Sequence, residues 1–162
     1  MVQYCPHCWQ EIPPGADPCP HCGKPTSEAG VPFVQKLLRT LRQPEPTRAG
    51  LAIDILTERL REPLAVDPLI DLLTASSDAA VLKQAVRGLG RLGDVRAIPP
   101  LVRLLRDPEI AFVVRGEAAS SLGKLGDPAA EAALRAALTD PLPSVAEAAR
   151  RALAGLHPEE AA

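Results

Sequence analysis

A repeat of about 33 residues restricts what this chain can fold into more than any other feature of its sequence. The segment Leu89-Gly90-Arg91-Leu92-Gly93-Asp94 recurs 33 residues later as Leu122-Gly123-Lys124-Leu125-Gly126-Asp127. A shift of 32 residues in the other direction aligns Arg91, Ala97, Pro100, Leu101 and Leu104 with Arg59, Ala65, Pro68, Leu69 and Leu72. Repeats of this length are supersecondary units that bury their apolar faces by stacking. The sequence therefore predicts three repeats, with Val145 to Leu156 as half of a fourth.

Each repeat is predicted to form two helices joined by a tight turn. Apolar residues recur at helical spacing in the central repeat, first as Leu82, Ala85, Leu89 and Leu92 and then as Ile98, Leu101 and Leu105. Gly93 and Gly126 stand where a left-handed residue ends a helix, and Asp94 and Asp127 follow as N-caps of the next helix. Pro99-Pro100 falls inside the second helix, so we expect a kink or a late start there.

Two further patterns concern the helix ends and the helix contacts. Four Asp-Pro pairs combine an N-cap with a proline at the first helical position: Asp67-Pro68, Asp107-Pro108, Asp127-Pro128 and Asp140-Pro141. Several residues of the first helices are small, which predicts a close approach of neighbouring helices: Gly88, Gly90, Ala118, Ala119 and Gly123.

The repeats resemble the HEAT-like repeats of phycobilin lyases, whose short units end the first helix in Leu-Gly-x-Leu-Gly-Asp. The resemblance covers residues 47–156 and is good for residues 82–138. The first unit departs from the motif, with Thr57-Glu58-Arg59-Leu60-Arg61-Glu62 in its place. The resemblance implies an all-α HEAT-like solenoid over residues 47–162. It implies little about activity, because arrays of this kind have many functions.

Four cysteines form two Cys-x-x-Cys pairs near the N-terminus, Cys5-Pro6-His7-Cys8 and Cys19-Pro20-His21-Cys22. Two such loops can direct four thiolates at one ion, which predicts a closed, structural Zn²⁺ site with Cys5, Cys8, Cys19 and Cys22 as ligands. The segment resembles the short zinc-ribbon family, which implies a small β-ribbon over residues 1–24. Because this segment has few apolar side chains, we expect it to fold only when metal binds.

Three other interpretations of the cysteines are less favoured. The second pair with Gly23 also resembles a knuckle of rubredoxins, so metal analysis is needed to distinguish zinc from iron. A redox dithiol normally stands alone beside a βαβ unit, which this sequence lacks. His7 and His21 could replace a thiolate, but both are flanked by cysteines and are expected to point to solvent.

Residues 25–46 are predicted to be a linker followed by a helix that caps the array. Residues 23–32 have linker composition, and apolar residues then recur at helical spacing as Val34, Leu37, Leu38 and Leu41. Lys36, Arg39 and Arg42 lie on the other side of this helix. A basic amphipathic helix for a partner or a membrane surface is the alternative interpretation.

From these features we expect a non-enzymatic zinc-binding scaffold or adaptor that binds a protein partner through its second helices. Outside the zinc ligands the sequence contains no cysteine, and its third histidine is His157, so a nucleophile paired with a base is not apparent. The sequence does not identify the partner, the oligomeric state or whether ribbon and repeats bind jointly.

Charge and hydropathy limit the partners and the compartment. The formal net charge is −2, and no basic stripe runs across the aligned repeats, which disfavours nucleic acid. A nucleic-acid-associated regulatory protein and a bilin lyase-like chaperone are the alternatives. No segment has the length of apolar sequence that a membrane span needs, and no export signal is apparent, so we expect a cytoplasmic protein.

Overall fold

The computed structural model describes residues 3–8, 10–26, 31–42 and 46–156. Two short strands, β1 (Gln3–Tyr4) and β2 (Glu11–Ile12), pair antiparallel with Gln3 opposite Ile12. The helices that follow are α1 (Phe33–Thr40), α2 (Pro46–Asp54), α3 (Val66–Ala75), α4 (Ala79–Leu92), α5 (Ile98–Arg106), α6 (Phe112–Leu125), α7 (Glu131–Ala137) and α8 (Pro143–Leu156). A π-helical turn (Ile55–Arg59) extends α2, and 3₁₀ turns precede α3, α5 and α7 at Pro63–Ala65, Val95–Ala97 and Pro128–Ala130.

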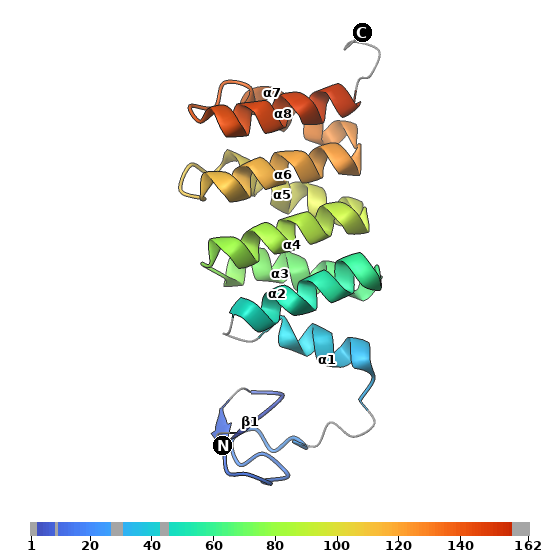
Figure 1. Ribbon diagram of the computed structural model, residues 1–162, viewed down its shortest axis with the longest axis vertical. Helices are drawn as coiled ribbons and strands as arrows, with labels where there is room; N and C mark the ends of the chain where they lie inside the picture. Colours follow the sequence, from blue (N-terminus) through green and yellow to red (C-terminus); the bar gives the residue numbers. More distant parts are fainter. Residues whose placement is uncertain (1–2, 9, 27–30, 43–45, 157–162) are drawn as a thin grey trace.

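The helices form two stacked layers, which confirms the predicted all-α solenoid. The first helices of the repeats, α2, α4, α6 and α8, lie side by side, with the second helices α3, α5 and α7 behind them (Figure 1). We call these the first-helix layer and the second-helix layer. Neighbouring first helices contact each other extensively, whereas neighbouring second helices do so sparsely. The more closely packed layer is therefore that of the first helices, whereas a docking surface on the second helices stays a prediction.

A single apolar core runs between the two layers from α2 to α8 and consists of Leu, Ala, Val and Ile. One leucine from each of several helices is completely buried in it: Leu69, Leu89, Leu101, Leu122 and Leu134. Burial of such side chains contributes about 1.5–3 kcal/mol each. The helical periodicity of the sequence therefore identified the core-facing residues of the repeats correctly.

The turns inside the repeats have the predicted geometry. Gly93 and Gly126 are left-handed, with φ of 75° and 68°. The Asp94 carboxylate accepts a hydrogen bond from the Arg96 backbone N–H at 2.9 Å, and Asp127 makes the equivalent bond. α5 starts late, after a 3₁₀ turn, so that Pro99-Pro100 lies in its first turn, where no backbone N–H is needed.

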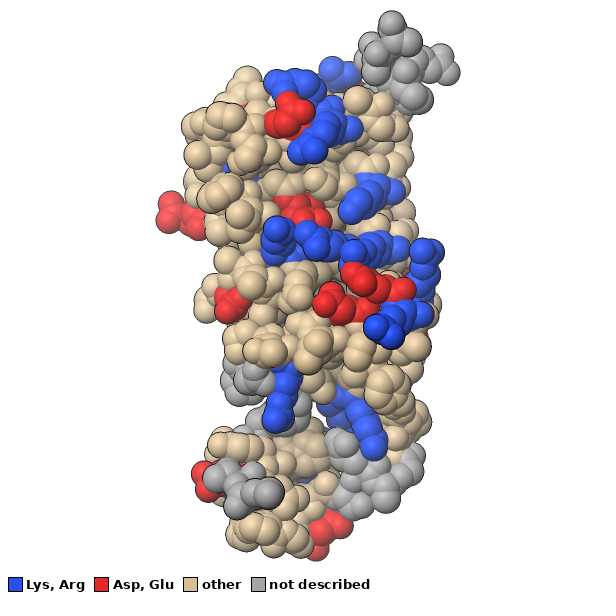
Figure 2. Space-filling view, in the orientation of Figure 1, with Lys and Arg blue, Asp and Glu red and all other residues tan. Residues whose placement is uncertain are grey.

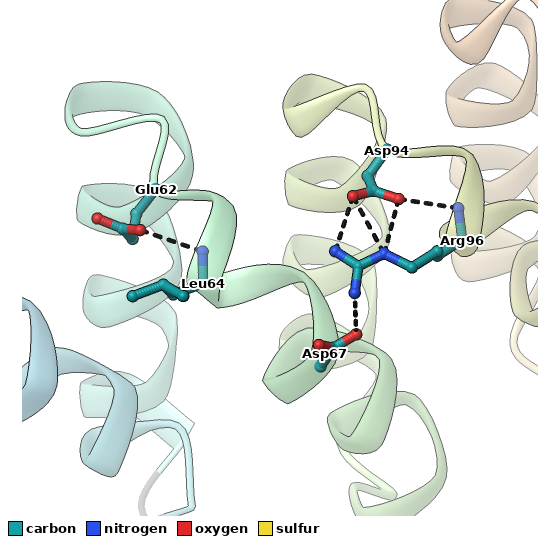
Figure 3. Close-up of polar contacts among 5 residues, drawn as sticks. All are labelled: Glu62, Leu64, Asp67, Asp94 and Arg96. Atoms are coloured by element: carbon teal, nitrogen blue, oxygen red, sulfur yellow. Dashed lines mark hydrogen bonds and ion pairs between the residues drawn. The ribbon is translucent and has the colours of Figure 1, made fainter.

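The first repeat forms the same turn without the sequence motif (Figure 3). Arg61 occupies the left-handed position with φ of 48°, and the Glu62 carboxylate accepts a hydrogen bond from the Leu64 backbone N–H at 3.1 Å. Arg96 then joins this repeat to the next one, because its guanidinium contacts Asp94 at 2.8 Å and Asp67 at 2.7 Å.

Three of the four Asp-Pro pairs have roles that differ from the predicted one. Asp127 is an N-cap as expected. Asp67 lies within the first turn of α3, because the preceding 3₁₀ turn already starts the helical path. Asp107 and Asp140 accept N–H groups two residues ahead of them, in the turns between repeats. Asp140 also pairs with the buried Arg115 at 2.9 Å.

Small residues set the spacing of the first-helix layer, as predicted. A Cβ atom added to Gly123 would lie 2.7 Å from the Cβ of Ala152, and one added to Gly90 would lie 2.6 Å from the Ser121 hydroxyl oxygen. The Ser121 hydroxyl donates a hydrogen bond to the Val86 carbonyl at 3.0 Å, so this buried polar group is satisfied between α4 and α6. Larger side chains at these positions would force the helices apart.

Two glycine substitutions in α6 should therefore shift stability in opposite directions. Gly123→Ala should lower the free energy of unfolding by about 1–3 kcal/mol, because its methyl group overlaps the backbone of α8. Gly116→Ala is the matched control, since an added Cβ would meet its nearest atoms only at 4.0 Å. It should stabilise the protein by up to about 1 kcal/mol through helix propensity. Urea unfolding measures both, and equal shifts would contradict the close contact between α6 and α8.

Candidate metal centre and first-helix face

The four cysteines come together in the N-terminal segment, at a separation that suits one metal ion. Cys5 and Cys22 have their sulfur atoms 3.7 Å apart, as do Cys8 and Cys19, and all four sulfurs lie within 4.8 Å of one another. Four sulfurs arranged tetrahedrally at about 2.3 Å from one ion are about 3.8 Å apart. The cluster could therefore hold a metal ion through four thiolates.

Two similar backbone loops position the cysteines. The His7 N–H points to the Cys5 sulfur, and the His21 N–H points to the Cys19 sulfur, each at 3.4 Å. Gly23 closes the second loop with φ of 68°, a left-handed conformation that glycine adopts without strain. N–H groups that point at a sulfur favour its thiolate form, which is the form that binds metal.

The thiols differ in acidity because their surroundings differ. Burial raises the pKa of the Cys5 thiol, but the backbone N–H groups of Cys8 and His7 and the neighbouring thiols lower it more, to about 6. The Gln10 N–H lowers the pKa of the Cys8 thiol, whereas desolvation and the three other thiols raise it, to about 12. Four thiolates this close together repel one another, and a divalent cation would offset that repulsion.

The histidines of the two loops do not belong to the sulfur cluster. His21 is exposed, as expected, and its Nε2 lies 3.1 Å from the Glu11 backbone oxygen, which ties the second loop to β2. Apart from cysteine, the small core of this segment contains the buried Ile12 and the half-buried Ala16. So little apolar burial is consistent with a segment that depends on metal.

We expect each reduced chain to bind about one metal ion and Cys19→Ser to abolish that binding, because three thiolates hold the ion much more weakly than four. His7→Ala is the control, because it changes the same segment without removing a thiol. This variant should keep the ion. Elemental analysis of the purified proteins measures both. Retention of a full equivalent of metal by Cys19→Ser would contradict the four-sulfur site.

The repeat array has no comparable cluster. Among the described residues, the cysteines are the only group of three or more Cys, His, Asp or Glu side chains placed to hold a metal ion. Residues 46–156 contain neither histidine nor cysteine. In the part of the chain that the structure describes, no helix has the length and apolar character that crossing a membrane requires.

The outer surface of the first-helix layer carries charged residues that the sequence analysis did not connect (Figure 2). Arg87 on α4 pairs with Glu117 on α6 at 2.9 Å, and Arg91 on α4 pairs with Glu58. Burial raises the pKa of Glu117, but the Arg87 guanidinium lowers it more, so Glu117 stays ionised at neutral pH. These pairs link neighbouring repeats and could not be assigned before the order of the helices in space was known.

The array defines a HEAT-repeat solenoid. Residues 34–113 match the family described as HEAT repeats, and residues 114–140 match the PBS lyase HEAT-like repeat. The first match includes α1. The resemblance to phycobilin-lyase repeats is thus confirmed for the third repeat.

The named relatives of the chain are enzymes. It is 32% identical to deoxyhypusine hydroxylase of Gallus gallus over 127 residues, which are 78% of this chain and 42% of that protein. It is 40% identical to phycocyanobilin lyase subunit alpha of a Nostoc strain over 75 residues, covering 43% of this chain and 26% of the relative. The chain spans between 25% and 42% of the curated relatives it matches.

Solved structures give the same two similarities. Human deoxyhypusine hydroxylase in complex with glycerol superposes with a TM-score of 0.69 at 30% identity, over 79% of this chain and 44% of that one. A chain of the CpcE–CpcF complex of phycocyanin lyase from Nostoc superposes with a TM-score of 0.56 at 23% identity, over 91% of this chain and 72% of that one. The second similarity shows the fold alone.

These similarities contradict our expectation of a non-enzymatic scaffold. The absence of histidine and cysteine from the array suggested that no chemistry takes place there, yet the relatives named above are a hydroxylase and a lyase subunit. The inference failed because the lack of a recognisable nucleophile and base pair in the sequence does not exclude an enzymatic role.

Proposed function

We propose that this chain is a subunit of a lyase-type enzyme that works with a second protein chain. The observation that carries the proposal is the 40% identity to phycocyanobilin lyase subunit alpha. A protein named as a subunit acts together with another chain. The fold of the array is similar to that of a chain in the CpcE–CpcF complex of phycocyanin lyase.

The residue content of the array favours lyase over hydroxylase chemistry. Hydroxylation of a carbon atom needs an activated oxidant, which proteins obtain from a redox metal or an organic cofactor. The array has no imidazole or thiolate to hold a redox metal, and its described carboxylates form no metal-binding group. Lyase reactions are addition and elimination steps that need acid and base groups. A second chain can supply part of these groups to a shared site.

We further propose that the cysteine cluster binds a structural Zn²⁺ ion. Four thiolates fill the tetrahedral positions of zinc and leave none for a substrate. The ion would order the N-terminal segment, whose own apolar core is small. Cysteines stay reduced and able to bind metal in reducing compartments, which supports a cytoplasmic location. Iron in the same site would give the protein visible colour, and zinc would not.

Comparison of native cells with and without the gene tests the proposed function. The tagged chain should co-purify with one other protein in a ratio of about one to one, as expected for a closed complex of two different subunits. Deletion should remove a covalent modification from a host protein, seen by mass spectrometry as the loss of one defined mass. Re-expression of the chain should restore it. An unchanged set of protein masses in the deletion strain would contradict the proposal.

A further inference from the structure

A groove lies between α6 and α8 on the outer surface of the first-helix layer. Its volume is about 310 Å³, and it is lined by Ser120, Gly123, Lys124, Ala148, Arg151 and Ala152. We call it the α6–α8 groove. It lies on the face of the array that Figure 2 shows, where Lys and Arg side chains are interspersed with Asp and Glu.

The floor of the groove is made of backbone and methyl groups. This follows from the close contact between Gly123 and Ala152, where no side chain larger than a methyl group separates the two helices. The Ser120 hydroxyl donates to the Gly116 carbonyl at 3.0 Å and is therefore engaged within its own helix. A ligand in the groove would meet an apolar floor, and its polar contacts would come from the rim.

The rim carries two cations that share their nearest carboxylates with other cations. Lys124 is exposed and interacts electrostatically with Glu117, which pairs with Arg87. The Arg151 side chain is 73% exposed and reaches Glu147 only at 3.8 Å. Glu147 lies closer to Arg150, with which it also pairs. By contrast, Arg87 and Arg91 on α4 are paired with carboxylates of neighbouring repeats.

Neither the net charge of the chain nor the helix dipoles explain the positive charge of the rim. The chain as a whole has a formal net charge of −2, so a positive groove is a local feature. Lys124 and Arg151 lie towards the C-terminal ends of their helices, where the dipole contributes about half a negative charge. Each side chain carries a full positive charge, so the rim remains positive overall.

We propose that the α6–α8 groove binds an extended, acidic segment of a partner protein. Carboxylates of that segment would pair with Lys124 and Arg151, and its chain would lie on the methyl floor. A nucleic acid is disfavoured because two cations neutralise too few phosphates on a chain of negative net charge. A small inorganic anion is disfavoured because the N–H groups of the helix interior are already bonded and cannot surround it.

Fluorescence anisotropy with a labelled hexaglutamate peptide at low ionic strength tests the proposal. The wild-type chain should bind the peptide, and a double variant, Lys124→Glu with Arg151→Glu, should bind it about tenfold more weakly or not at all, because attraction becomes repulsion. The matched control is Arg103→Glu with Arg106→Glu on α5, which changes the net charge equally but lies in the second-helix layer. That variant should retain binding within about twofold.

Three results would overturn the proposal. The wild type could fail to bind hexaglutamate, or both double variants could weaken binding equally. The third result is that a single-stranded oligonucleotide binds more tightly than the peptide and depends on the same two residues. Thermal unfolding of each variant establishes that the array is intact. A hexaglutamine peptide, which has the same length without charge, should not bind. Each of these results leaves the proposed lyase function untouched, because that function is tested by covalent modification in cells.

Discussion

The close contact between consecutive first helices is the constraint on which the rest of the structure depends. Gly90 faces Ser121 and Gly123 faces Ala152 at distances that exclude an added Cβ atom. Because of this contact, α4, α6 and α8 form one continuous layer, and the shorter second helices pack against its inner side. The layer in turn brings charged residues of neighbouring repeats within reach of each other. The ion pairs and the α6–α8 groove are both consequences of that spacing.

Much of the fold could be predicted because it depends on local sequence. The turns at Gly93 and Gly126 need a residue in the left-handed conformation, and glycine at these positions indicates that conformation in the sequence. The first repeat shows the limit of such signals, since Arg61 takes the same backbone conformation without the motif. Asp67 was misassigned because a 3₁₀ turn starts the second helix earlier than the proline position suggests, and Asp107 and Asp140 because they lie in the turns between repeats. A local pattern does not determine where the preceding turn begins.

The cysteine cluster was predicted from the sequence and the function was not, because the cluster depends on local spacing and the function does not. The spacing of Cys5, Cys8, Cys19 and Cys22 predicted that four thiols come together, because each pair is local and only a short segment separates the two pairs. The pairing of Arg87 with Glu117 depends on the stacking of two repeats and could not be predicted from the sequence. Function depends further on what the chain binds. A search for catalytic residues within the sequence therefore did not anticipate that its named relatives are enzymes.

Native-state hydrogen exchange of the amides tests the central claim that contacts between first helices hold the array together. Backbone amides in the middle of α4 and α6 should be the slowest to exchange, because each of these helices is packed between two neighbours of its own layer. Amides of α5 and α7 should exchange faster. Equal or greater protection of the second helices would show that the stability of the array lies in the other layer and would contradict this account.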